Sequence, residues 1–362
     1  MSDYDLLKKR YKVQIVPCEI CHSHETKHFH ARGRSEEPGT YGNVPVRVCN
    51  HCGHLMINPR YEDDFYKEYY ELMYREVAFG SEKPSATYLA QQKDRGKAVL
   101  NYVNRFITRP GVMLDHGCAS GFTMQGWIEN GWACFGVDPH RPSVELGNTL
   151  GFNVKIGAGE DLPFKDQSFD LVLSLGSLEH TYDTNAAMME INRTLTNEGH
   201  LVIRWRSNVI YGSPLEYFNH NHNRFFSPKT FKLLLLKFGF EIVNESDEKH
   251  EGWDSYSYLI AKKSSEAIDQ KRIDELIKSG ICENADALIT KKQKTCASYY
   301  RRSKQFKDIF DKRNGEAIEI MEDVKKQSLD WGFLGGDPKQ AVDRSYMEAT
   351  AFIFEYESGL VT

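Results

Sequence analysis

The amino-acid sequence predicts an α/β fold built on a Rossmann-like sheet of seven strands. Between residues 109 and 262, short apolar segments alternate with helical patterns, which is typical of a parallel sheet whose strands are joined by helices. A glycine turn with Gly117 and Gly121 follows one apolar segment, and Asp138 ends the next. In doubly wound sheets, an acid about 20 residues after a glycine turn is where a ribose is bound.

The apolar segments set the order of the expected elements. Strands are expected at 112–115, 133–137, 153–156, 170–174 and 200–205. Helices are expected near 121–130, 142–150, 184–195 and 229–238. Two further apolar segments, 240–244 and 255–261, predict an antiparallel pair that closes the sheet.

Composition limits the classes of function. A net charge of −5 and an isoelectric point near 6.2 argue against general nucleic-acid binding, which favours a basic face. The N-terminal residues have no apolar core of a signal peptide, and no apolar run approaches the length needed to cross a membrane. We therefore expect a cytoplasmic protein without a membrane span, in which the eight cysteines are not disulfides.

Residues 1–60 are expected to form a zinc-binding domain. They contain two C-x-x-C pairs, a pattern typical of a tetrahedral zinc site with four thiolate ligands: Cys18, Cys21, Cys49 and Cys52. Such a site has no open coordination position, so its role would be structural. Two alternatives remain: His22 or His51 replaces one thiolate, or the cysteines are two reduced thiol pairs. The other histidines of this segment are expected at the surface.

Two regions flank the predicted sheet. Residues 61–108 are rich in aromatic residues and form a helical connector, in which Phe65, Tyr69, Leu72 and Met73 recur at helical spacing. This connector is either a helix packed on the sheet domain or a lid over a substrate cleft. Residues 263–362 predict a helical extension, with helices such as 267–277 and 303–324, for packing or for a homodimer. An alternative places the loop 331–336 at the active site.

The glycine turn has the pattern D-x-G-x-x-x-G, beginning at Asp115. A dinucleotide pyrophosphate needs G-x-G-x-x-G, and an acid at this position would repel it. A carboxylate there suits a cation instead. S-adenosylmethionine (SAM) carries an α-amino group and a sulfonium, and it has no phosphate.

Four segments in order resemble the motifs of class I SAM-dependent methyltransferases: LDHGCASGF, GVDP, GEDLPFKDQSFDLV and EINRTLTNEGHLVI. The resemblance covers about residues 85–262, so 109–262 would be the SAM-binding domain. It implies that Asp138 binds the ribose and that Leu175 lines the methyl-bearing face. It also implies contacts with the methionine end or the adenine from Asp115, Gly117, Ala119, Gly121, Glu160 and Asp161. Ala158 departs from the family, in which an acid contacts the adenine amino group.

The four-cysteine segment followed by this domain resembles bacterial sugar and natural-product methyltransferases, including the deoxysugar C-methyltransferases. That resemblance places His222 at the position of the catalytic base. Asn221 and Asn219 replace the supporting Glu and Tyr, which favours O-methylation over C- or N-methylation. His180, which follows the fourth strand, is the second candidate for a base or substrate ligand.

The resulting hypothesis is methyl transfer to a sugar nucleotide or glycan intermediate, in surface polysaccharide or natural-product biosynthesis. One alternative acceptor is another small metabolite. A third hypothesis is a zinc-ribbon interaction module with a SAM-sensing domain. Arg204 and Arg206, at the end of the fifth strand, would bind an anionic group of the substrate or pair with surface acids.

Overall fold

The computed structural model describes residues 7, 9–30, 45–79, 81, 84–206, 222–249, 255–264, 266–314, 316–327 and 338–358. The loop 331–336, which was a candidate for the active site, lies outside the described residues. The same holds for Asn219 and Asn221, the two positions that favoured O-methylation.

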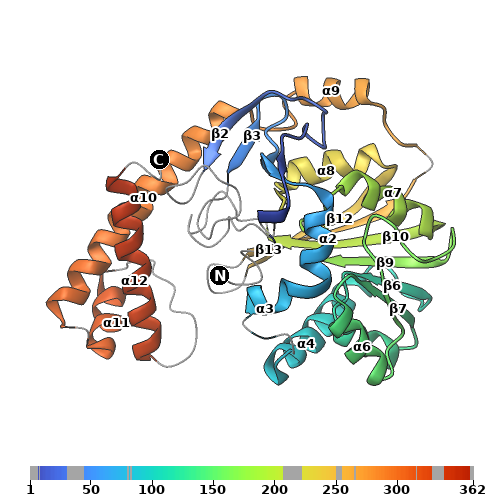
Figure 1. Cartoon of the computed structure of the whole chain (residues 1–362), viewed down its shortest axis with the longest axis horizontal. Helices are drawn as coiled ribbons and strands as arrows, with labels where there is room; N and C mark the ends of the chain where they lie inside the picture. Colours follow the sequence, from blue (N-terminus) through green and yellow to red (C-terminus); the bar gives the residue numbers. More distant parts are fainter. Residues whose placement is uncertain are drawn as a thin grey trace.

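A seven-stranded mixed sheet forms the centre of the molecule, in the order β12-β13-β10-β9-β6-β7-β8 (Figure 1). The five neighbouring strands from β10 to β8 are parallel, and β13 runs antiparallel to both β10 and β12. The predicted α/β fold and the closing antiparallel pair are confirmed. The strands are β6 (Val112–His116), β7 (Ala133–Asp138), β8 (Val154–Ile156), β9 (Phe169–Leu175), β10 (Leu195–Arg206), β12 (Phe240–Lys249) and β13 (Ser255–Lys263).

Helices cover both faces of this sheet, so its central strands are apolar on both sides. Met113 of β6 packs in one core cluster with Val99 and Trp127, whereas its neighbour Leu114 packs in the other with Ile191. The first face is covered by α4 (Ala86–Val103), the single turn η2 (Phe122–Met124), α5 (Gln125–Glu129) and α6 (Arg141–Thr149). The second is covered by α7 (Thr184–Thr194) and α8 (Pro228–Lys237).

The start of the aromatic connector pairs with a strand near the N-terminus, and a broken helix follows beside the sheet. Strand β1 (Val13–Gln14) pairs with β5 (Arg60–Tyr61), and α2 (Asp63–Glu68), the π-helical turn η1 (Tyr69–Met73) and α3 (Tyr74–Phe79) follow. Phe65 and Tyr69 of the predicted stripe are buried, but Leu72 is 53% exposed. A π-helical turn holds extra residues, so it shifts the side chains that follow away from the expected face.

The cysteine segment contributes a second, four-stranded sheet with the order β11-β4-β3-β2. Three strands come from the N-terminal residues: β2 (Thr26–His30), β3 (Val46–Cys49) and β4 (Leu55–Ile57). The edge strand β11 (Arg224–Phe225) comes from the sheet domain, and its two residues pair with Met56 and Leu55. The cysteines themselves belong to the same core cluster as α7 and α8.

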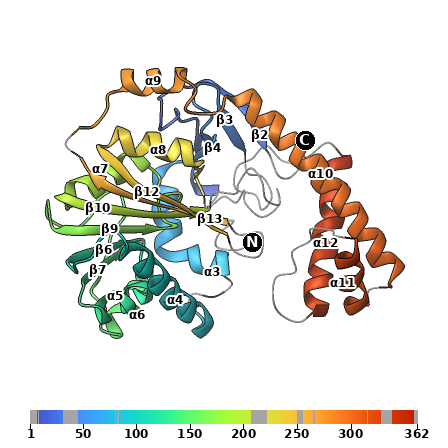
Figure 2. The ribbon, with the colours of Figure 1, turned by 180° about the vertical axis from the view of Figure 1, so that it is seen from behind.

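The C-terminal residues are helical, as expected, and α10 links them to the cysteine sheet. Leu288 near its start packs against Phe29 and Val48, and its far end packs with α11 and α12 in a separate cluster (Figure 2). The expected helix at 303–324 is wrong as one element, because α10 ends at Lys312 and Asn314 has φ of 48°. The helices are α9 (Gln270–Lys278), α10 (Ala285–Lys312), α11 (Ala317–Lys326) and α12 (Pro338–Glu357).

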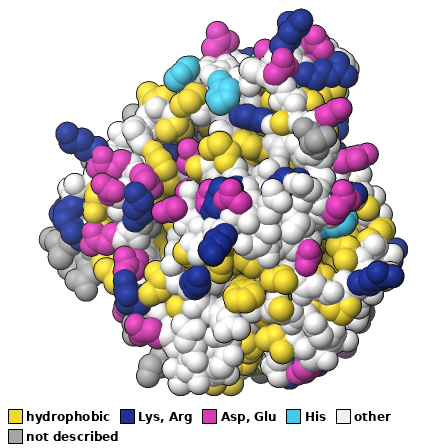
Figure 3. All heavy atoms as spheres, turned by 90° about the vertical axis from the view of Figure 1, so that its right-hand side faces the viewer, with side chains coloured by type: hydrophobic (Ala, Val, Ile, Leu, Met, Phe, Trp, Pro, Cys, Tyr) yellow, Lys and Arg dark blue, Asp and Glu magenta, His cyan; other side chains and the backbone are white. Residues whose placement is uncertain are grey.

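The surface carries both signs of charge. On the face turned to the viewer in Figure 3, Lys and Arg side chains are interspersed with Asp and Glu, and neither sign forms a continuous patch. Among the helices that the structure describes, none combines the length and the apolar character that a membrane crossing requires.

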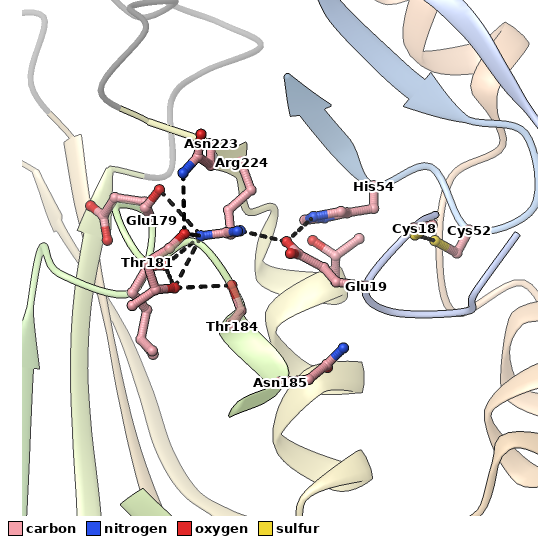
Figure 4. A network of polar contacts seen from close by, with 12 residues as sticks. Cys18, Glu19, Cys52, His54, Glu179, Thr181, Thr184, Asn185, Asn223 and Arg224 are labelled. Atoms are coloured by element: carbon pink, nitrogen blue, oxygen red, sulfur yellow. Dashed lines mark hydrogen bonds and ion pairs between the residues drawn. The ribbon is translucent and has the colours of Figure 1, made fainter. Parts of the chain in front are cut away.

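Arg224 of β11 connects the two sheets through a buried network of hydrogen bonds (Figure 4). Its Nε donates to Glu19 Oε1 at 2.6 Å, and Glu19 lies between the first two cysteines in the sequence. The same carboxylate oxygen lies 2.9 Å from Nε2 of His54, which is 0% exposed. The expectation that His54 is a surface residue is therefore wrong, because its imidazole is buried in contact with the carboxylate of Glu19.

The other nitrogens of Arg224 bind the loop that follows β9. Nη1 donates to Leu178 O at 3.1 Å and to the carbonyl of Thr181, and Nη2 donates to Tyr182 O at 2.9 Å. Although burial opposes ionisation of Glu19, the charge of Arg224 and the hydrogen bond from His54 hold the pKa of Glu19 well below its usual value. This network is therefore an ion pair in which the other nitrogens of the guanidinium donate to backbone carbonyls and to the hydroxyl of Thr181.

The substitution Arg224→Met is expected to lower the free energy of unfolding by about 3–5 kcal/mol, because it leaves the charge of Glu19 buried without its cation. Chemical denaturation of the metal-loaded protein measures this change. The matched control is Arg141→Met, which breaks an ion pair with Glu71 whose side chains are 50% and 39% exposed. That variant is expected to unfold at nearly the same denaturant concentration as the parent. Equal effects of the two substitutions would contradict this account.

Candidate functional site

The turn after β6 is fixed in an unusual backbone conformation. Gly117, Ala119 and Gly121 all have positive φ, at 79°, 49° and 83°. A side chain at Gly117 would meet Ser177 Cβ at 2.5 Å, so glycine is required both by φ and by space. Ala119 has the same left-handed conformation with a β-carbon, which costs energy that the surroundings must supply.

Asp138 at the end of β7 supplies part of that support. Its Oδ2 accepts a hydrogen bond from Ala119 N at 2.8 Å, and its Oδ1 accepts one from His140 N at 2.9 Å. Gly117 N and Cys118 N donate to Val137 O. The turn is thus fastened to the end of β7, where the sequence placed the ribose-binding acid.

Asp115 lies beneath this turn with an unsatisfied oxygen. The residue is 2% exposed, and its Oδ2 has no hydrogen-bond partner among the described residues. Burial, and secondarily the charge of Asp138, raise the pKa of Asp115 to about 7. Burial also raises the pKa of Asp138, against its two backbone donors. A buried acid with an unsatisfied oxygen, beside a second acid that is partly buried, fits a ligand that brings positive charge, such as the α-amino group of SAM.

The adenine-side residues lie in different settings. Glu160 Oε1 accepts hydrogen bonds from Tyr182 N at 2.7 Å and Asp183 N at 3.3 Å, so its carboxylate holds the loop after β9. Asp161 is exposed, and Leu175 is half-buried at the end of β9. Their contacts with adenine remain predictions.

His116 is a buried residue of the site that the sequence reasoning missed. Its Nδ1 lies 3.1 Å from Ser177 Oγ, and this hydroxyl also donates to His116 O at 2.6 Å. Burial lowers the pKa of His116 to about 4, so the ring is neutral at physiological pH. A buried neutral histidine at the end of β6 thus fixes the start of the loop that carries His180.

The structure brings the two candidate histidines together. The ring centroids of His180 and His222 are 4.5 Å apart. His180 lies in the loop after β9, and His222 lies just before β11. The hydroxyl of Tyr70, in the π-helical turn η1, lies 3.0 Å from His180 Nδ1. Burial raises the pKa of Tyr70 well above its usual value, so the phenol stays neutral.

Glu179 completes this group, and sequence reasoning did not select it. One potential ligand atom from each of Glu179, His180 and His222 lies within 4.8 Å of the others. The only sequence signal was an acid beside a histidine directly after a buried strand. Arg204 faces inward instead, with 7% exposure and a hydrogen bond of 2.9 Å from Nε to the hydroxyl of Tyr258. The side chain of Arg206 lies outside the described part of the chain.

The four cysteines of the C-x-x-C pairs form one buried cluster. Their sulfurs all lie within 4.8 Å of one another, and Cys18–Cys52 and Cys21–Cys49 are each 3.5 Å apart. Zinc–sulfur bonds of about 2.3 Å in a tetrahedron place sulfurs about 3.8 Å apart, so the donor set fits zinc. The alternative ligands have other partners: His22 Nε2 lies 3.1 Å from Lys237 Nζ, and His51 Nε2 lies 3.3 Å from Asp274.

Known proteins resemble the central part of the chain. Residues 114–203 match a family model described as a methyltransferase domain. The uncharacterized methyltransferase YcgJ of Bacillus subtilis is 30% identical over 98 residues, which cover 25% of this chain and 39% of YcgJ. A ubiquinone biosynthesis O-methyltransferase of Bartonella bacilliformis is 22% identical over 151 residues, which cover 37% of this chain and 61% of that protein. The chain therefore spans less than two thirds of either relative.

A match to one solved structure covers a longer stretch of the chain. The 1,6-didemethyltoxoflavin-N1-methyltransferase of Burkholderia thailandensis has 17% sequence identity and a TM-score of 0.46, over 59% of this chain and 96% of its own.

The family match begins inside β6 and ends inside β10. It therefore contains the glycine turn, Asp115, Asp138 and the loop that carries His180, within the seven-stranded sheet. Residues 114–203 form the core of a class I SAM-dependent methyltransferase domain.

Proposed function

We propose that this protein transfers a methyl group from SAM to a small-molecule acceptor. The observation that carries the proposal is a pair of acids, the buried Asp115 and the partly buried Asp138, at a turn with positive φ inside the matched domain. SAM supplies a methyl group already activated by the sulfonium. The protein then has to bind the cofactor, position the acceptor and remove its proton.

The cofactor would lie across the ends of β6 and β7. The methionine end would be held by Asp115 and by the turn at Gly117, Ala119 and Gly121. The unsatisfied Oδ2 of Asp115 would accept a hydrogen bond from the α-amino group. Asp138 would bind the ribose hydroxyls with lone pairs that Ala119 N and His140 N leave open. Glu160 would act on adenine indirectly, since its carboxylate orders the backbone at Tyr182. Leu175 and Asp161 complete the predicted set.

The acceptor side is where His180 and His222 meet. Either imidazole could accept a proton or hydrogen-bond the acceptor, and the Tyr70 hydroxyl fixes the orientation of His180. We infer a sugar nucleotide or glycan intermediate as acceptor, with O-methylation favoured, because the cysteine unit ahead of this domain resembles sugar methyltransferases. The similar ubiquinone biosynthesis enzyme is named as an O-methyltransferase, which supports oxygen as the methylated atom. Its name also favours another small metabolite as a second candidate acceptor.

The cysteine cluster would hold one structural zinc ion. All four thiols are at most 8% exposed, which leaves no open position for a substrate. The ion would fix Glu19 between two of its ligands and, through Arg224, the loop that carries His180.

Cofactor affinity is expected to rise between about pH 6 and pH 8, because Asp115 has a raised pKa and pairs with a cation only when ionised. Calorimetric titration with S-adenosylhomocysteine measures this trend. In Asp115→Asn the trend should disappear, and affinity at the upper pH should fall at least about tenfold. Asp170→Asn is the control, since Asp170 Oδ2 accepts from Val112 N at the other end of the sheet. Absence of binding by the parent protein would contradict the methyltransferase proposal.

Incubation with SAM and a panel of nucleotide sugars is expected to yield a methylated product, detected by mass spectrometry. His222→Asn should lower the rate by about 10²–10⁴ if the imidazole removes the acceptor proton. Its affinity for S-adenosylhomocysteine should stay unchanged, and the control His200→Asn, on β10, should keep the parent rate. Transfer only to acceptors without a sugar would refute the sugar assignment. An unchanged rate in His222→Asn would refute the role of His222.

Purified protein is expected to hold one zinc ion per cysteine cluster, and Cys52→Ser should lose one equivalent in metal analysis. Loss of a structural zinc removes up to about 10 kcal/mol of folding free energy, so this variant should also melt at a lower temperature. The control is Cys282→Ser, because Cys282 is half-buried and outside the cluster. Full zinc content in Cys52→Ser would show that the thiols are not the ligands.

A further inference from the structure

Three side chains with metal-ligand chemistry converge outside the cysteine cluster. They are Glu179 and His180, in the loop after β9, and His222, just before β11. Their ligand atoms lie within 4.8 Å of one another, and each side chain is half-buried. Two imidazoles and one carboxylate are a common donor set for first-row transition cations, in sites that keep open coordination positions.

We propose that Glu179, His180 and His222 bind a divalent transition-metal cation that holds the oxygen of the methyl acceptor. The binding itself stands on the three ligands, whereas its role in catalysis rests on the proposed methyl transfer. Metal–ligand bonds of about 2.0–2.2 Å place neighbouring donors about 3–4 Å apart. The observed spacing therefore needs only a small inward movement of the side chains when the cation binds.

The hydrogen bond to Tyr70 orients one ligand for this role. The hydroxyl of Tyr70 lies 3.0 Å from Nδ1 of His180, so Nε2 is the nitrogen that we assign to the cation. Metal-binding histidines usually make such a bond from their other nitrogen, because it fixes the tautomer and the ring plane. Tyr70 comes from the π-helical turn, so this irregular turn has a function in the site.

Buried backbone contacts hold the two ligand-bearing segments against each other. Asn223 N donates to Glu179 O at 3.0 Å, and Asn223 Nδ2 donates to Thr181 O at 3.2 Å. Arg224 Nη1 binds Leu178 O at 3.1 Å and Glu179 O at 3.5 Å. These hydrogen bonds, which include those of the fully buried Arg224, therefore hold the two ligands of the loop after β9 close to the ligand before β11.

A cation at this position changes how the acceptor loses its proton. The acceptor hydroxyl would coordinate the cation, which lowers the pKa of the hydroxyl, and its proton would pass to water. A lone pair of the resulting oxygen forms the new bond to the methyl carbon. The carbon–sulfur bond of SAM breaks with its electron pair on sulfur, which becomes a neutral thioether. The histidines then act as metal ligands, and no free imidazole base is required.

Titration of the zinc-loaded protein with Co²⁺ tests the site. We expect one equivalent of Co²⁺ to bind, with a visible absorption spectrum typical of nitrogen and oxygen ligands. Exchange of Co²⁺ into the cysteine cluster would instead give a thiolate-to-cobalt charge-transfer band, which we do not expect. His222→Ala and Glu179→Gln should each weaken this binding at least tenfold, while His200→Ala leaves it unchanged. Failure of Co²⁺ to bind, or binding that survives both ligand substitutions, would overturn the proposal.

A second measurement separates this inference from the proposed function. Affinity for S-adenosylhomocysteine is measured with and without Co²⁺, in the parent and in Glu179→Gln. Cobalt binding without cofactor binding would leave the metal site intact and refute the methyltransferase proposal. Binding of S-adenosylhomocysteine without binding of Co²⁺ would refute the metal site and leave the methyltransferase proposal intact. Where a methylated product is found, its rate should fall in Glu179→Gln, which a free histidine base alone would not require.

Discussion

The buried ion pair between Arg224 and Glu19 is the interaction on which the arrangement of the two sheets depends. A guanidinium that is 0% exposed must find acceptors for its N–H groups, and it finds them on one acid from the cysteine unit and on carbonyls of the loop after β9. The same residue is part of the edge strand β11. Any movement of Glu19 away from the sheet domain would therefore also release the loop that carries His180.

The central fold follows from local patterns, and those patterns were sufficient to predict it. Apolar strands buried on both faces and glycine turns at their ends specify a parallel sheet wherever they occur in a sequence. The features that were missed depend on other causes. The break between α10 and α11 depends on a single residue with positive φ, Asn314, and the π-helical turn adds residues to a pattern that otherwise looks regular. The edge strand β11 has only two residues, too few for any periodic signal.

The sequence was sufficient to select those candidate residues that directly follow an apolar strand. Asp115, Asp138 and His180 were selected from their positions after apolar segments, and His222 from the resemblance to sugar methyltransferases. His180 and His222 do lie 4.5 Å apart. The residues that support them were not predictable, because their partners are distant in sequence. Glu19 and Arg224 are 205 positions apart, and Tyr70 and His180 are 110 apart. Nothing in either local segment indicates such a partner.

The pairing of β11 with β4 has a consequence for the order in which the chain becomes structured during synthesis. The cysteine residues leave the ribosome early, but the strand that completes their sheet and the arginine that neutralises Glu19 follow only at residues 224–225. Until then the edge of β4 is unpaired and the carboxylate has no buried cation. The cysteine sheet thus reaches its final packing together with the methyltransferase domain, as one late, long-range step of folding.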